Sequence, residues 1–406
     1  MKYTYICTYI VIIIINILLS YSSTTTNITT IYPHNLLSYN NKPKSFPQSH
    51  RILQEHPSEF ILSFTVIRSE NNVLRSKVCI GSPERCGMFK LSTISSIMWT
   101  FTSPNDVSSP LYNPKHSNTS KNLRTSIQLS ENAQHIEADL YEDSISIDNY
   151  LIGRLSFAII PTTSKVYTDQ YDGAIGLGYS NDQSIPSLLE HVDKQNLIDY
   201  NVYYINFYST DKATLTIGNF PYDSYYMDHF MFKTCNVFKY KENSSISINN
   251  RWECLLTAIY YRSFGKDYFH KVNTRISFNA SSNLILVSDT FFDVFVNEYF
   301  GNFISTNQCT VERSYDAYSS VQCKEETNYK LLPKIKFMIG KWSVSFTYDD
   351  IMRKTEYNTI ECVIKKHNTL NTFIFGYPLF KKYIVIFDKM SSRIGLIRNN
   401  KRGNNK

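Results

Sequence analysis

Two short segments place hydroxyl and carboxyl groups directly after apolar runs that are typical of strands. One is the Ser/Thr-rich run at residues 92–96, and the other is Ser288-Asp289-Thr290, which follows Leu-Ile-Leu-Val. A serine such as Ser92 becomes a nucleophile only beside a base, and His135 is the candidate base. A lone carboxylate, in contrast, can act as a general acid or base without a partner. The residue types therefore favour Asp289 over Ser92 as a reactive group.

The elements that would position these groups are predominantly strands. From about residue 61, short runs rich in β-branched and aromatic residues alternate with Gly, Pro, Asn and Ser, for example FILSFTVI, GMFKLS and LSFAII. The clearest helical pattern is SIPSLLEHVDKQNLI at residues 184–198, where Ser184 can cap the first turn. The pattern predicts a mainly β chain with two similar halves, residues 61–215 and 216–398.

Both ends of the chain differ from this pattern. Residues 1–23 have the layout of a secretory signal peptide, with a lysine before an apolar run and small polar residues after it. Residues 24–60 are rich in Ser, Thr, Asn and Pro and predict a poorly ordered leader or prosegment, and residues 399–406 predict a basic disordered tail. We therefore expect a secreted or lumenal protein in an oxidising compartment, with no membrane association after signal removal.

Composition excludes several classes of partner. The formal charge of +7 is diffuse, and basic residues are not interleaved with aromatic ones on one face, so no nucleic-acid partner is expected. No paired Cys-x-x-Cys or His-x-x-x-His spacing predicts a metal site, and we expect no cofactor. Asn-x-Ser/Thr sequons predict glycosylation at Asn27, Asn118, Asn243 and Asn279. We expect a monomer.

Four blocks occur in a fixed order along the chain. They are VCIGSPERCGMFKLSTISSIMW, ADLYEDSISIDNYLIGRLSFAII, YDGAIGLGYSNDQSIPSLLEHVDKQNLI and FIFGYPLFKKYIVIFDKMSSRIGLI. Together they resemble the pepsin-like aspartic peptidase family over about residues 61–398. The resemblance implies the bilobal acid protease fold, which is mainly β, with a substrate cleft between the two lobes.

The family's chemistry uses two aspartates, one in each lobe. Like charges that lie so close cannot both ionise, so the pair shares a proton and holds a water molecule. Each family aspartate begins an Asp-Thr-Gly loop, whose glycine lets the chain bend sharply. In this chain Thr93, Ser95 and Trp99 match the first loop, but Ser92 replaces the acid and Ile94 replaces the glycine.

The second family motif has two possible registers in LILVSDTFFDVFV. Ser288-Asp289-Thr290 replaces Asp-Thr-Gly in one register, and Asp289-Thr290-Phe291 replaces it in the other. Neither register gives two acids, and a shift of one residue decides whether Asp289 faces the cleft. In the flap, Leu129 stands where the family has tyrosine. The residues expected to line the cleft are Thr93, Ile94, Ser95, Trp99, Leu129 and Thr290.

Seven cysteines remain after removal of the signal peptide. Cys79 and Cys86 flank the first hairpin turn and are predicted to form a disulfide across it. Cys235 and Cys254 flank a polar, Asn-rich loop and are predicted to close it with a second disulfide. The resemblance implies a bridge between Cys323 and Cys362 in the second lobe. Cys309 then stays unpaired or competes for Cys323, because sequence alone does not fix connectivity.

The first functional hypothesis is a pseudopeptidase that has lost its aspartate pair and keeps a cleft for a peptide or protein ligand, or acts as a scaffold. An active endopeptidase with an atypical site that uses Asp289 is the second hypothesis. The third is a secreted adhesin-like interaction protein that uses only the fold.

Overall fold

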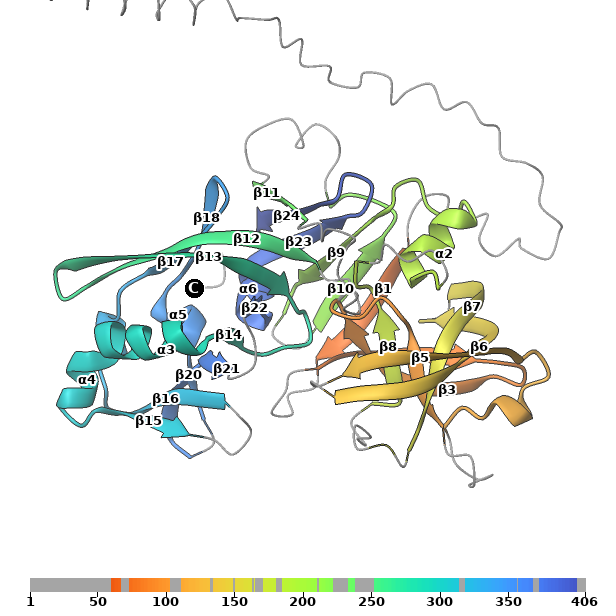
Figure 1. Cartoon of the computed structure of the whole chain (residues 1–406), viewed down its shortest axis with the longest axis horizontal. Coiled ribbons are helices and arrows are strands. Elements are labelled where there is room, and N and C mark those ends of the chain that lie inside the picture. Colours follow the sequence, from red (N-terminus) through yellow and green to blue (C-terminus); the bar gives the residue numbers. More distant parts are fainter. Residues whose placement is uncertain are drawn as a thin grey trace, which may run out of the picture. The chain divides into compact units, whose positions relative to one another are not determined.

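A computed structural model describes two large β-sheets and several short helices (Figure 1). The described residues are 60–66, 73–102, 111–131, 134–148, 150–162, 164, 171–179, 185–209, 212–221, 233–237, 252–313, 318–355, 357–367 and 372–399. The mainly β, pepsin-like class expected from the sequence is confirmed. The segments expected to be a signal peptide, a leader and a basic tail lie outside the described residues, apart from Phe60 and Asn399 at their borders.

The first sheet has 13 strands and contains both early and late segments of the chain. Its order is β11-β24-β23-β9-β10-β1-β2-β3-β8-β4-β7-β6-β5, so β23 lies beside β9, and β24 lies between β23 and β11. Its strands are β1 Phe60–Val66, β2 Leu74–Ile80, β3 Arg85–Ser92, β4 Trp99–Thr102, β5 Lys121–Glu131, β6 Gln134–Ile147, β7 Tyr150–Pro161, β8 Gly173–Gly176, β9 Val202–Phe207, β10 Lys212–Ile217, β11 Lys233–Asn236, β23 Tyr383–Asp388 and β24 Arg393–Arg398.

The second sheet has 11 strands, all from the region between residues 253 and 375. Its order is β18-β17-β12-β13-β22-β14-β21-β16-β20-β19, with β15 paired to β16. Its strands are β12 Glu253–Ser263, β13 Lys266–Phe278, β14 Ile285–Ser288, β15 Cys309–Arg313, β16 Tyr318–Lys324, β17 Ile335–Ile339, β18 Trp342–Phe346, β19 Met352–Lys354, β20 Thr359–Cys362, β21 Ile364–His367 and β22 Thr372–Phe375.

The two sheets contain the same five-strand arrangement. In the first it is β2-β3-β8-β4-β7, and in the second it is β12-β13-β22-β14-β21. In both arrangements, the second strand pairs in parallel with the third (β3 with β8, and β13 with β22). The fourth strand pairs antiparallel with the third (β4 with β8, and β14 with β22). The fourth strand also pairs in parallel with the fifth (β4 with β7, and β14 with β21). The loop between β3 and β4 therefore corresponds to the loop between β13 and β14.

Helices are few and short. The clearest predicted helix is present as α2, Leu188–Lys194, but Ser187 rather than Ser184 caps it, through its side chain and the Glu190 backbone. No helix among the described residues is long and apolar enough to span a membrane. The other helical segments are η3 Pro114–His116, α3 Asp289–Phe295, η5 Val296–Phe300, α4 Gly301–Ser305, η6 Tyr329–Leu331, α5 Tyr348–Ile351 and α6 Tyr377–Lys382.

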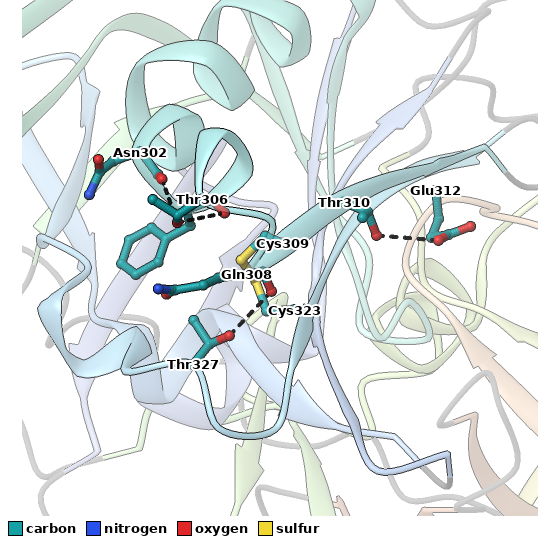
Figure 2. Close-up of a disulfide and its surroundings, with 9 residues drawn as sticks. Asn302, Thr306, Gln308, Cys309, Thr310, Glu312, Cys323 and Thr327 are labelled. Atoms are coloured by element: carbon teal, nitrogen blue, oxygen red, sulfur yellow. Dashed lines mark hydrogen bonds between the residues drawn. A yellow bond between two sulfur atoms is a disulfide. The ribbon is translucent and has the colours of Figure 1, made fainter.

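Three disulfides link strands of the structure. Cys79–Cys86 and Cys235–Cys254 are present as the sequence predicted. The predicted Cys323–Cys362 bridge is wrong, because Cys323 is bonded to Cys309. Figure 2 shows this bridge at the start of β15, where Thr327 donates a hydrogen bond to the carbonyl of Gln308 at 3.2 Å.

Strand register explains the change of partner. Cys309 lies directly opposite Cys323 in the antiparallel β15–β16 pair, with their Cα atoms 4.0 Å apart. On the other side of β16, Cys323 lies opposite Ile360, which puts Cys362 two residues further along β20. Cys362 is a fully buried free thiol.

The Cys362 thiol should resist alkylation in the folded protein. Burial raises its pKa to about 12, so the reactive thiolate is scarce at neutral pH. We expect no iodoacetamide adduct at Cys362 in native protein, and complete labelling after denaturation without reductant. Peptide mapping should recover Cys309 and Cys323 as one disulfide-linked pair. Rapid native labelling of Cys309 would contradict this connectivity.

Candidate functional site

The first candidate loop begins where β3 ends, at Ser92. This serine is 2% exposed, and its hydroxyl accepts a hydrogen bond from the backbone N–H of Ser95 at 3.2 Å. Its carbonyl accepts from the N–H of Leu177 at 2.8 Å, just after β8. The local backbone therefore holds Ser92 rigidly at the end of a central strand.

Thr93 joins this loop to the second sheet. Its hydroxyl donates to the carbonyl of Phe278 at 2.8 Å and accepts from the N–H of Ala280 at 3.2 Å. In return, the hydroxyl of Ser281 donates to the carbonyl of Leu91. The segment opposite the Ser92 loop is thus the end of β13 and the residues that follow it.

Strand register identifies the counterpart of Ser92. In the first sheet, Ser92 lies opposite Gly176 in the parallel β3–β8 pair. In the second, Phe278 lies opposite Phe375, and the next residue, Asn279, donates its N–H to the Phe375 carbonyl at 2.9 Å. This register sets Asn279 against Gly376, so Asn279 occupies the position that Ser92 has in the first loop.

Two further features agree with this alignment. A Cβ atom on Gly176 would lie 2.5 Å from the backbone of Ile97, and one on Gly376 would lie 2.3 Å from the backbone of Ser282. Both glycines are therefore required for a close approach between strand and loop. Ser95 and Ser282 also accept equivalent hydrogen bonds, from the N–H groups of Ile97 at 3.3 Å and Leu284 at 3.2 Å.

The second motif therefore lies at Asn279-Ala280-Ser281 rather than at residues 288–291. The apolar run Leu-Ile-Leu-Val belongs to β14, the strand that leaves the loop, whereas the strand that enters it is β13. Ser288 ends β14, and Asp289 begins α3 with its side chain 55% exposed and paired with Lys366. None of the described hydrogen bonds or ion pairs connects Asp289 with the Ser92 loop.

The two opposed groups are both neutral. Asn279 is half-buried, and its side-chain oxygen accepts from the N–H of Ser281 at 3.0 Å. Its amide NH2 has no hydrogen-bond partner among the described residues. Neither a carboxamide nor an aliphatic hydroxyl ionises at physiological pH, so this pair cannot share a proton as two carboxyl groups do.

The internal repeat is asymmetric at the residues that join the loops. Ala280 stands where Thr93 stands in the first loop, and its methyl group cannot donate a hydrogen bond. Ser281, which replaces the glycine of the family's second motif, supplies a hydroxyl one residue later and bonds to Leu91. The serine at this position therefore contributes a contact between the loops.

The remaining cleft residues predicted from the first loop and the flap lie in the first sheet. Thr93 is fully buried, whereas Ile94 and Ser95 are half-buried. Trp99 and Leu129 belong to one apolar cluster, in which Leu129 lies opposite Ile136 across the β5–β6 hairpin. The flap strands thus pack directly on the tryptophan that follows the first loop.

A cation lies beside the same tryptophan. The ammonium group of Lys90, a buried residue of β3, donates to the Tyr171 hydroxyl at 3.1 Å and lies 5.3 Å from the ring centroid of Trp99. No sequence motif indicated this contact. The side chain of His135, the candidate base for Ser92, lies outside the described residues.

The other predicted site residues are dispersed. Thr290 is exposed on α3 rather than in the loop that opposes Ser92. Among the sequons, Asn118 is exposed and suited to glycosylation, whereas Asn279 lies in the second loop. Asn27 and Asn243 fall outside the described residues.

Comparison with known families agrees with the fold. The family model described as eukaryotic aspartyl protease matches residues 75–398. The chain belongs to this family. No curated protein sequence matches the chain significantly. Within the aspartyl protease family, the two loops that normally carry the catalytic acids are here Ser92-Thr93-Ile94 and Asn279-Ala280-Ser281.

Proposed function

We propose that this aspartyl protease family member is a pseudopeptidase that binds a peptide or protein ligand, or acts as a scaffold. The observation that carries the proposal is the pair Ser92 and Asn279, which are opposed at the ends of two equivalent strands. General acid–base hydrolysis in this family needs one ionised and one protonated carboxyl group. With neither present, the bound water has no base to activate it.

The same pair is suited to holding a peptide without cleaving it. The amide NH2 of Asn279 can donate to a peptide carbonyl, and the buried threonine contacts keep the two loops together. Three disulfides support a secreted or lumenal location, where thiols are oxidised. We propose that the mature protein acts there as a monomer.

The test is an endopeptidase assay on the purified mature protein. We expect no cleavage of denatured casein above the buffer blank between about pH 3 and 7, where carboxyl pairs of this kind operate. Asp289→Asn should leave the result unchanged, and an active acid protease added to the same casein serves as the positive control. Acid-dependent cleavage that disappears in Asp289→Asn would instead establish an active enzyme with an atypical site.

A further inference from the structure

One edge of β13 is paired over only part of its length. Along one side, β13 pairs with β12 over residues 266–271 and 274–277, but along the other only residues 275–278 pair with β22. Within the described part of the chain, no strand pairs with that second edge over residues 266–273. An unpaired edge presents backbone N–H and C=O groups that another extended segment can use.

A hollow of about 390 Å3 lies next to this edge. It is bounded by β13, the end of β14, helix α3 and β22, and Figure 1 shows α3 beneath β13. Phe291 and Phe373, both buried, form an apolar floor with their ring centroids 5.5 Å apart. Thr290 and Val294 on α3 line the opposite side of the hollow. Its volume falls within the range of ordinary ligand pockets.

The wall on the β13 side is held in place by a hydrogen-bonded cluster. His270 bonds through Nε2 to Glu298 at 2.8 Å, and the hydroxyl of the buried Tyr261 donates to the same carboxylate at 2.6 Å. The imidazole also stacks on the Tyr261 ring and meets Phe291 edge-on. This wall is preformed, which lowers the conformational cost of binding.

Burial alternates along β13. Tyr268, His270 and Val272 are half-buried, whereas Phe269 and Lys271 are exposed. His270 and Val272 line the hollow, and Lys271 lies at its rim. A strand added to this edge would follow the same alternation, with every second side chain directed at the hollow and the others placed beside Lys271.

The exposed cations along β13 favour an acidic partner. Lys266 and Lys271 are exposed cations of β13, and no ion pair involves either of them among the described residues. The one acid on this stretch, Asp267, already accepts from the Tyr260 hydroxyl at 2.7 Å and lies 3.7 Å from Arg262. Acidic side chains opposite these lysines would be complementary to them.

We propose that the edge of β13 at residues 266–272, which pairs with none of the described strands, is a docking site for an extended peptide in which apolar and acidic residues alternate. The apolar side chains enter the hollow over Phe291, the acidic ones face Lys271, and the peptide backbone extends the second sheet. Asn273, with a left-handed φ of +43°, ends the straight part of the edge. The site is separate from the Ser92–Asn279 pair and does not depend on whether that pair is inactive.

The probe is a fluorescein-labelled acetyl-Glu-Val-Glu-Phe-Glu-Val amide, followed by fluorescence polarisation with the full mature protein. We expect saturable binding that weakens at least tenfold in Thr290→Trp, which fills the hollow, and in Lys271→Glu. Thr290 is exposed on its helix, so the substitution should not disturb the fold, and Val294→Glu provides a second test of the same wall. Lys341→Glu makes the same charge change at an exposed turn outside the site. This variant should bind the peptide with the same affinity as the unsubstituted protein.

Two peptides with backbone N-methyl groups at alternate residues, one methylated at the odd positions and the other at the even positions, distinguish strand addition from nonspecific adsorption. The peptide whose methylated nitrogens face β13 should not bind, because it can no longer donate hydrogen bonds to the β13 carbonyls, whereas the other peptide should bind. Equal binding of the two methylated peptides, or binding unaffected by Thr290→Trp and Val294→Glu, would overturn the proposal. Sedimentation that reveals a dimer abolished by Lys271→Glu would also overturn it, since the edge would then join two copies of this chain. Neither outcome depends on casein cleavage.

Discussion

Replacing Thr93 with valine should destabilise the protein by about 2–4 kcal/mol. The hydroxyl is fully buried, donates to the carbonyl of Phe278 and accepts from the N–H of Ala280. Valine has the same shape but leaves both backbone groups without this partner, and each buried unsatisfied group costs about 1–3 kcal/mol. The measurement is the midpoint of guanidinium-induced unfolding, followed by tryptophan fluorescence.

Thr102 offers a matched control for this substitution. It is also buried on the first sheet, and its hydroxyl has no hydrogen-bond partner within the described residues. Thr102→Val should therefore be neutral or stabilising, since it removes an unsatisfied polar group. If Thr93→Val and Thr102→Val change the midpoint equally, the Thr93 contacts contribute nothing to holding the loops together. Ser281→Ala should give a smaller loss than Thr93→Val, because it removes one bond.

Introducing aspartate at both Ser92 and Asn279 should make stability strongly dependent on pH. Two carboxylates at these opposed positions cannot both ionise without repulsion, so the pKa of one rises above its unfolded value of about 3.9. Between those two pKa values the folded state binds more protons than the unfolded state, and stability falls as pH rises. A rise of about two units corresponds to roughly 3 kcal/mol lost at pH 7 relative to pH 3.

The single variants isolate the repulsion. Ser92→Asp and Asn279→Asp each introduce one charge without a like neighbour, so the interaction energy of the double-mutant cycle should be unfavourable at pH 7 and vanish near pH 3. Unfolding curves of all four proteins at both pH values measure this energy. An interaction energy of zero at pH 7 would mean that residues 92 and 279 are not opposed across the loops.

The sequence predicted the fold well because the fold depends on repeated, local signals. Three such signals are the alternating β-branched residues, the block that contains Asp172 and the closing block that contains Gly376. Each marks a strand or turn where tight packing allows few substitutions. Gly376 illustrates this, because any side chain there would collide with the backbone of Ser282. The apolar run before the first loop likewise forms a strand, β3, which ends at Ser92.

The second loop was misplaced for a physical reason. Two strands, β13 and β14, flank the loop. Asp289 follows the second of them, and the sequence pattern therefore predicted the motif there instead of after β13. Asn279 has nearly the shape of aspartate and follows Ile-Ser-Phe, which was the available signal. The pairing of β13 with β22 decides the register, and such contacts between residues distant in sequence cannot be predicted from a local sequence pattern. The Cys309–Cys323 bridge depends in the same way on strand register.

The position of β23 and β24 has a consequence for biosynthesis. Within the first sheet, β23 pairs with β9, and β24 pairs with β23 and β11. Among the described strands, β10 pairs with one edge of β9 and β23 with the other, so this second edge has no described partner until the second sheet has been synthesised. Nascent protein that stops before residue 383 would expose this edge to other chains. Synthesis of β23 and β24, the last strands of the first sheet along the chain, is therefore needed to complete that sheet.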